Sequence, residues 1–151
     1  MVRRFNLTDT GGKRMFEEIS IKTVKNDVVQ ITDAIQKIVE KSGVGDGICV
    51  IYCTHTTAGL ITTSFGDRKG HEDIQDELRK LIPTRVDFKH QHDTPEDAAG
   101  HVKSAVVGSS LTLFVEQGKL YMGNTKGVYF IEFDGPRERK VLVKVMGKNC
   151  S

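Results

Sequence analysis

The sequence predicts an α+β fold whose core is a mainly antiparallel, β-sandwich-like arrangement of about seven strands with three helices. Strand-sized apolar segments outnumber helical ones, and they follow one another in groups instead of alternating strictly with helices. This order favours antiparallel pairing. The chain has 151 residues, of which 38% are hydrophobic and 28% charged, a composition typical of globular proteins. We therefore expect a single domain over residues 1–151.

The predicted strands show either alternation or a short continuous apolar run. Residues 15–24 alternate loosely and residues 141–145 alternate cleanly between apolar and other side chains, as half-buried strands do. Residues 48–53 are continuously apolar, which predicts a strand buried on both faces. The remaining predicted strands are residues 3–7, 111–115, 120–122 and 128–133. The sequence Glu-Gln-Gly-Lys between the second and third of these indicates a hairpin.

Three segments combine helical periodicity with start and stop signals. The first helix is expected to begin at Asp27, a typical N-cap residue, and to end at Gly43. The second covers residues 71–82 and ends before a proline. The third begins at Thr94, which is followed by a proline and two acidic residues, and continues to about Val107.

Composition and charge argue against two classes of partner. The net charge is only +2, from 22 basic and 20 acidic residues that form no long basic run, so we expect no nucleic-acid binding. No apolar stretch approaches the roughly 18 residues of a membrane span. Three cysteines, an odd number, do not fit a closed disulfide framework. Together with an N-terminus that has no apolar signal core, this predicts a cytoplasmic protein.

Polar side chains directly follow the buried strand. Thr54, His55, Thr56 and Thr57 place an imidazole among three hydroxyl groups, where a rigid strand gives way to a loop. Hydroxyl groups and loop amides can hold an anion, and an imidazole can bind a metal or move a proton. A β-turn in which the threonines cap backbone groups explains the same residues equally well.

The third helix carries a second candidate group. Asp97 and His101 are four positions apart and share one helical face, so that the carboxylate can orient the imidazole. Ala98, Ala99 and Gly100 between them allow another element to approach closely. Lys103 lies about 200° around the helix from His101, so one face cannot present both. The alternative is an ordinary surface pair.

Two further candidates lie in loops. His90, just before the third helix, could complete a three-histidine metal site with His55 and His101 that leaves a coordination position open for water. A solvated loop is the alternative. Arg137 follows a tight Asp-Gly-Pro turn that would aim its guanidinium group at a phosphate. A plain turn with a salt bridge accounts for it equally well.

Three separated motifs carry a resemblance to a known family. They are CTHTTAGL at residues 53–60, DAAGHVKS at 97–104 with GSS at 108–110, and EFDGPR at 132–137. In this order they resemble the YjbQ-like family, labelled secondary thiamine-phosphate synthases, over residues 16–145. The resemblance implies a compact α+β fold that forms a homotrimer, with a polar site that binds a metal or an anion.

The activity that the resemblance implies joins hydroxymethylpyrimidine diphosphate to thiazole phosphate and releases pyrophosphate. The expected ligands are therefore a small phosphorylated molecule and a divalent metal, magnesium or zinc. The alternative is a non-catalytic trimer that binds a metal or an anionic metabolite. The expected catalytic residues are His55, Asp97 and His101; the expected phosphate-binding residues are Thr54, Thr56, Thr57, Lys103 and Arg137; the expected metal ligands are His55, His90 and His101.

Two stretches depart from the family pattern. Residues 63–67 read Thr-Ser-Phe-Gly-Asp, where the family usually has Asn-Glu-Asn-Ala-Asp. Residues 123–127 read Gly-Asn-Thr-Lys-Gly, where the family usually has Gly-Thr-Trp-Gln-Gly. If the missing carboxylate, amide and indole groups line the site, the substrate of this chain differs from that of its relatives.

Overall fold

The computed structural model describes residues 16–90 and 92–149, and it confirms the α+β class. In this part of the chain there are eight strands and three helices. In order they are β1 (Glu17–Thr23), β2 (Val28–Gln30), α1 (Thr32–Ser42), β3 (Val44–Cys53), β4 (Ala58–Ser64), α2 (Arg68–Leu81), α3 (Pro95–Val107), β5 (Ser110–Glu116), β6 (Lys119–Tyr121), β7 (Lys126–Glu132) and β8 (Arg137–Asn149).

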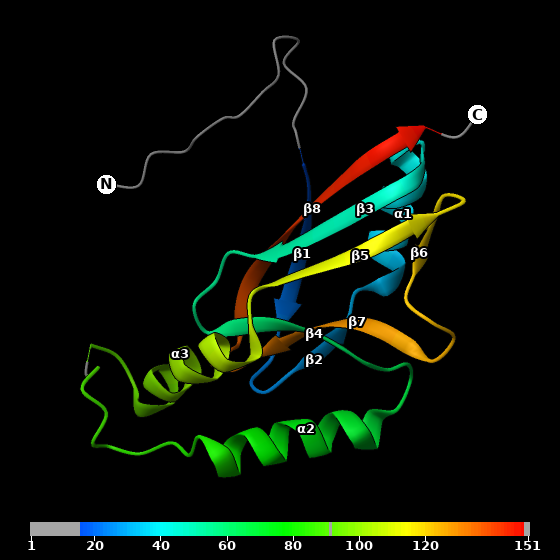
Figure 1. The fold of residues 1–151 in the computed structure, drawn as a ribbon. Coiled ribbons are helices and arrows are strands. Elements are labelled where there is room, and N and C mark those ends of the chain that lie inside the picture. Colours follow the sequence, from blue (N-terminus) through cyan, green and yellow to red (C-terminus); the bar gives the residue numbers. More distant parts are fainter. Residues whose placement is uncertain (1–15, 91, 150–151) are drawn as a thin grey trace, which may run out of the picture.

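The strands form two antiparallel sheets that face each other. The larger has the order β1-β8-β3-β5-β6 and the smaller the order β2-β7-β4. The chain changes sheet several times, and the last of these passages in the described residues runs from β7 to β8, through residues 133–136. As Figure 1 shows, α2 and α3 lie on the side of the smaller sheet that faces away from the larger one. No helix in the described ranges combines the length and the apolar character needed to cross a membrane.

The hydrophobic core fills the space between the two sheets and α1. Ile51 from β3 and Val143 from β8 point into it from the larger sheet, and Leu60 and Phe130 from the smaller one. Ile35 of α1 completes the contact. Each of these five side chains is at most 2% exposed. The core therefore fixes the position of β4, whose first residue follows the threonine-rich segment.

The first helix begins later than predicted. Residues 28–30 form the edge strand β2, which pairs with β7, and α1 starts only at Thr32. Asp27 does not cap a helix; its side chain accepts a hydrogen bond of 3.2 Å from the amide of Val24 and so closes a turn. Local capping chemistry was outweighed by pairing with a strand about a hundred residues away, which the sequence pattern does not reveal.

Other predictions differ from the structure in detail. The strand β4, which pairs with β7 along its whole length, was not predicted, because Ala-Gly-Leu-Ile-Thr-Thr-Ser shows no clean alternation. The helix α2 begins at Arg68, after the N-cap Asp67. The helix α3 is confirmed, with Thr94 as its N-cap and Gly108 as its C-cap. The strand predicted at residues 3–7 lies outside the described residues.

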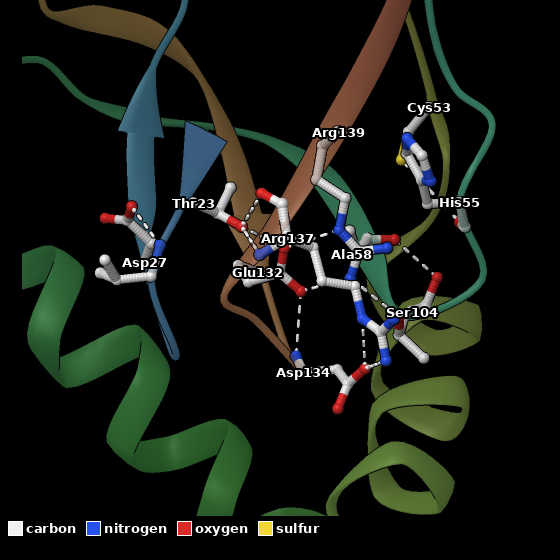
Figure 2. Close-up of polar contacts among 12 residues, drawn as sticks. Thr23, Asp27, Cys53, His55, Ala58, Ser104, Glu132, Asp134, Arg137 and Arg139 are labelled. Carbon is white, nitrogen blue, oxygen red and sulfur yellow. Dashed lines mark hydrogen bonds and ion pairs between the residues drawn. The ribbon is translucent and has the colours of Figure 1, made fainter. Parts of the chain in front are cut away.

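A buried ion pair joins the two sheets where the chain passes between them. Glu132, at the end of β7, is 0% exposed, and Arg139 of β8 is 5% exposed. The guanidinium group donates from Nε to Oε2 at 2.7 Å and from Nη2 to Oε1 at 2.5 Å. Figure 2 shows the pair with its partners. Such a bidentate geometry is the strongest form of an arginine–carboxylate contact.

The remaining bonds of this pair tie in two further segments. Thr23 of β1 donates to Oε2 of Glu132 at 2.7 Å, and the amide of Asp134 donates to Oε1 at 3.0 Å. Arg139 donates to Oγ1 of Thr57 at 2.9 Å. Burial by itself raises the pKa of Glu132, but the bonds from Arg139, Asp134 and Thr23 outweigh it and leave that pKa lowered. The carboxylate is therefore charged in the folded protein at neutral pH.

We expect Glu132→Gln to lower the free energy of unfolding by about 3–5 kcal/mol, because it leaves the buried charge of Arg139 without its partner. Chemical denaturation at pH 7 measures this loss.

The effect depends on pH. Because the pKa of Glu132 is lowered, the stabilisation that its carboxylate contributes is present above the ordinary value of about 4.5 and is lost as the pH falls through the folded pKa. The difference between variant and parent should therefore shrink at acidic pH. Glu138→Gln, at an exposed neighbouring site, is the matched control, and an equal loss in both would contradict the prediction.

Candidate functional site

Two histidines, one on α3 and one in the loop before it, lie beside a carboxylate in the first turn of α3. Oδ2 of Asp97 lies 3.3 Å from Nε2 of His90 and 3.3 Å from Nε2 of His101. The two imidazole rings have their centroids 4.8 Å apart and are nearly perpendicular. Thr94 fixes the start of this helix, since its hydroxyl accepts a hydrogen bond of 3.1 Å from the amide of Asp97. The cap therefore also sets the place of the carboxylate.

The donor set of this triad fits a tetrahedral metal ion. One ligand atom from each of His90, Asp97 and His101 can be chosen so that all lie within 4.8 Å of one another. Two ligands of a tetrahedral zinc ion are about 3.3–3.4 Å apart, given zinc–nitrogen and zinc–oxygen bonds near 2.0–2.1 Å. Both histidine–carboxylate distances agree with this separation. The side chains of His90 and His101 are 43% and 36% exposed, so a fourth position would face solvent.

His55 lies apart from the triad but near it. It lines a pocket of about 380 Å³ together with Thr54, Thr56, His101 and Ser109, which we call the hydroxyl pocket. Nε2 of His55 accepts a hydrogen bond of 2.7 Å from the amide of Lys140, so in the neutral ring the proton is on Nδ1. His55 was expected to form a metal site with His90 and His101. In the structure, the third group beside these two histidines is Asp97 instead.

Burial and nearby charge set the protonation of His55. Burial lowers the pKa of His55 from its ordinary value of 6.5, and the charge of Arg139 lowers it further. Glu132 and the amide bond from Lys140 act in the opposite direction but do not compensate. The ring is therefore neutral at pH 7, with a proton on Nδ1 that it can donate.

The predicted phosphate-binding threonines fall into two groups. Thr54 and Thr56 line the hydroxyl pocket. Thr57 is 5% exposed and accepts the bond from Arg139, so it belongs to the buried network instead. Thr57 packs closely on α3, because a Cβ atom at Gly100 would lie 3.3 Å from Cγ2 of Thr57. The small residues of this helix were expected to allow such a close approach.

The two predicted cations differ in burial and in the contacts that they make. Lys103 is buried and points away from His101, as the helical geometry predicts. Burial lowers the pKa of Lys103, and the charges of Arg79 and Lys25 lower it further. Arg137 is half-exposed and donates from Nε and Nη2 to Oδ2 of Asp134, at 2.8 and 2.5 Å (Figure 2). Hydrogen bonding and the charge of Asp134 raise the pKa of Arg137, with smaller contributions from Asp93 and Asp97.

The two stretches that depart from the family pattern lie far from these groups. Ser64 pairs with Lys126 across β4 and β7, and the amide of Phe65 donates to the carbonyl of Thr125 at 2.8 Å. This is the end of β4 opposite to the threonine-rich segment, about 20 Å away along the strand. Neither stretch lines the hydroxyl pocket.

Sequence reasoning missed the part that Asp97 and Arg139 play. Asp97 was expected only to orient His101, because its distance to His90 depends on the path of the loop that connects α2 to α3. Arg139 was not singled out at all, since in the sequence it stands among exposed charged residues. Its place on the inward-facing side of β8, two residues before Val141, was the only signal.

We expect the unfolding free energy to fall less steeply below pH 6.5 in His55→Gln than in the parent protein. A lowered pKa means that the unfolded chain takes up a proton on His55 at a higher pH than the folded protein does. Stability from this group is therefore full above pH 6.5 and is lost as the pH falls towards the folded pKa. Glutamine can still accept the bond from Lys140. Denaturation at several pH values measures the slope, and His92→Gln, at an exposed position, is the control; equal slopes in parent and His55→Gln would argue against this account.

Comparison with known proteins gives consistent matches over most of the chain. A UPF0047 protein of Methanocaldococcus jannaschii is 39% identical, over 89% of this chain and 96% of the relative. The UPF0047 protein YugU of Bacillus subtilis is 35% identical, over 88% of this chain and 100% of the relative. A crystal structure of a YbjQ-like protein of unknown function from Sulfolobus solfataricus superposes with a TM-score of 0.83 at 32% identity, covering 88% of this chain and 96% of that one. The model of the family described as UPF0047 protein YjbQ-like matches residues 17–148, and the chain therefore belongs to this family.

Proposed function

We propose that this chain binds a zinc ion at the His90–Asp97–His101 triad and acts there on a small phosphorylated molecule. The observation that carries the proposal is the shared carboxylate oxygen, 3.3 Å from the Nε2 atom of each histidine. Of the two metals expected, magnesium prefers oxygen ligands and usually keeps several waters. Two imidazoles with one carboxylate are instead typical of zinc, and three protein ligands with an open fourth position are typical of its catalytic sites.

The groups around the triad suit a phosphate. When bound, zinc supplies a Lewis acid that can polarise a phosphoryl oxygen. The hydroxyl groups of Thr54 and Thr56 can donate to phosphate oxygens. His55 holds its proton on Nδ1 while Nε2 is bonded to Lys140, so it can donate a further hydrogen bond. Arg137 uses Nε and Nη2 for Asp134, which leaves Nη1 for an anion.

The candidate reaction is the one that the resemblance implies. It joins hydroxymethylpyrimidine diphosphate to thiazole phosphate and releases pyrophosphate, a leaving group whose developing charge must be neutralised. Residues 63–67 and 123–127 lie at the end of β4 opposite to the threonine-rich segment and outside the hydroxyl pocket, which supports the view that their departures leave this chemistry unaffected. A cytoplasmic location is part of the proposal, since Cys49 and Cys53 are buried free thiols, as expected in a reducing compartment.

We expect His101→Ala and His90→Ala to abolish stoichiometric zinc binding, measured by isothermal titration calorimetry and by metal analysis after dialysis. Each substitution removes one of three ligands and leaves too few to hold the ion. His92→Ala is the matched control, because His92 lies in the same loop region and its ring contacts His90 without belonging to the triad. Zinc retained by His101→Ala as tightly as by the parent would contradict the proposed site.

Pyrophosphate release from the two thiamine precursors tests the reaction. We expect His101→Ala to reduce it by about 100-fold or more, with little change in melting temperature because the side chain is 36% exposed. A variant that melts early and yet keeps its activity per folded molecule would show that His101 is structural. A parent protein that binds zinc but forms no product would favour the alternative, a non-catalytic metal- or anion-binding protein.

We also propose that the chain forms the homotrimer that the resemblance implies. The outer face of the larger sheet carries an apolar row in which Tyr121 lies opposite Phe114, Phe114 opposite Ile48, and Ile48 opposite Met146. Phe114 and Tyr121 are 68% and 62% exposed. A row of this kind is typical of a surface that a further copy covers.

We expect light scattering to give the mass of a trimer at micromolar concentration and Phe114→Glu to shift it towards the monomer, because a charge in a covered apolar row loses its hydration. Val86→Glu is the control, since Val86 is 83% exposed but lies in the loop after α2. A stable monomer of the parent protein would contradict the proposed assembly, and a trimer that tolerates Phe114→Glu would place the interface elsewhere.

A further inference from the structure

His101 lies where two pockets of different character meet. One is the hydroxyl pocket of about 380 Å³. The other, of about 610 Å³, lies between the C-terminal end of α2, residues 82–90 and α3. Among the described residues, His101 is the one that lines both. His90 also lines the larger pocket, so two members of the triad border it.

The walls of the larger pocket are mainly apolar. They include Leu81, Ile82, Pro83, Phe88, Ala98 and Val102. Leu81 is 75% exposed and Val102 is 40% exposed, so both present apolar surface that the chain itself does not cover. We call this the apolar pocket. Its volume falls within the range of about 300–1,000 Å³ that is typical of small-molecule sites.

Two of the charged residues that line the apolar pocket pair with each other. The guanidinium of Arg85 pairs with the carboxylate of Asp87 at 3.2 Å and stacks over the ring of Phe88 at 4.7 Å. Arg85 is therefore held by contacts within its own loop, and it holds one face of the aromatic ring in place. The wall beside the triad is thus an oriented aromatic side chain, which suits a flat apolar group better than an anion.

We propose that the apolar pocket binds the apolar or aromatic part of a phosphate ester whose phosphate group lies at the triad. This inference rests on the proposed function and adds where the organic part of the ligand is bound. The phosphate is directed to the triad and the hydroxyl pocket, because the hydroxyl groups and His55 gather there. The organic part is directed to Phe88 and Val102, because they line the pocket on the other side of His101. The ligand class is therefore a monoester or diester of phosphoric acid with an apolar or aromatic alcohol.

Two simple esters probe the pocket without knowledge of the natural ligand. Phenyl phosphate and methyl phosphate carry the same anionic group and differ in the part that the apolar pocket would bury. We expect the zinc-loaded full chain to bind phenyl phosphate about tenfold or more tightly than methyl phosphate in calorimetric titrations, because only the phenyl ring covers Leu81, Phe88 and Val102. The zinc content of every sample is measured in parallel.

Variants locate the preference. Phe88→Ala should reduce the ratio of the two affinities to nearly one while methyl phosphate affinity and zinc content stay unchanged. Val86→Ala is the matched control, because it lies in the same segment but does not line the apolar pocket. Val102→Asn, a partly exposed position on α3, gives a second test in case Phe88→Ala does not fold.

The outcomes separate the two proposals. Equal affinities for the two esters, binding of neither, or a preference that persists in both Phe88→Ala and Val102→Asn would overturn the inference while the zinc content remained stoichiometric. A protein that takes up no zinc would overturn the proposed function itself. A preference that is lost in Phe88→Ala and kept in Val86→Ala supports the apolar pocket as the site of the organic group.

Discussion

The buried pair of Glu132 and Arg139 is the interaction on which the arrangement of the two sheets depends. It forms beside the connection from β7 to β8, and its remaining bonds reach Thr23 on β1 and Thr57 before β4. A charge removed from water is costly unless every lone pair and proton finds a partner. No buried side-chain nitrogen or oxygen in the described part of the chain lacks one. The network thus ties β1, β7, β8 and the segment before β4 together at one place in the fold.

The candidate site lies directly on this network. Thr57 links Arg139 to the segment that holds Thr54, His55 and Thr56, and it packs on α3 at Gly100, one residue before His101. The amide of Lys140, next to Arg139, fixes the ring of His55. The hydroxyl pocket and the triad are therefore positioned by backbone and buried contacts, as a site that must hold its geometry requires. Within the triad, His90 comes from a connecting loop, between α2 and α3, whereas Asp97 and His101 belong to α3.

The proposed binding of the two parts of a phosphate ester in two pockets follows from this arrangement of side chains. Imidazole and carboxylate groups gather on the exposed side of the N-terminal half of α3, hydroxyl groups gather on one side of His101, and apolar groups on the other. A phosphate ester has the same polarity, with an anionic and an organic part. Lys103 lies about 200° around the helix from His101 and is buried, and it lines neither the hydroxyl pocket nor the apolar pocket. Arg137 is about half-exposed, and its Nη2 lies 3.9 Å from Oδ2 of Asp93, just before α3.

The sequence by itself determined the fold class and the helix α3 with both caps, and it pointed to the segments that make up the candidate site, because capping residues, periodicity and the spacing of Asp97 and His101 are local properties. Only the tertiary structure decided that residues 28–30 form a strand, that Arg139 is buried, and that Asp97 joins His90 while His55 bonds to Lys140. Each of these outcomes depends on contacts between residues far apart in the chain or on the path of a loop. Strand pairing and the path of the loops settle such contacts, and the sequence of one segment does not specify its distant partner.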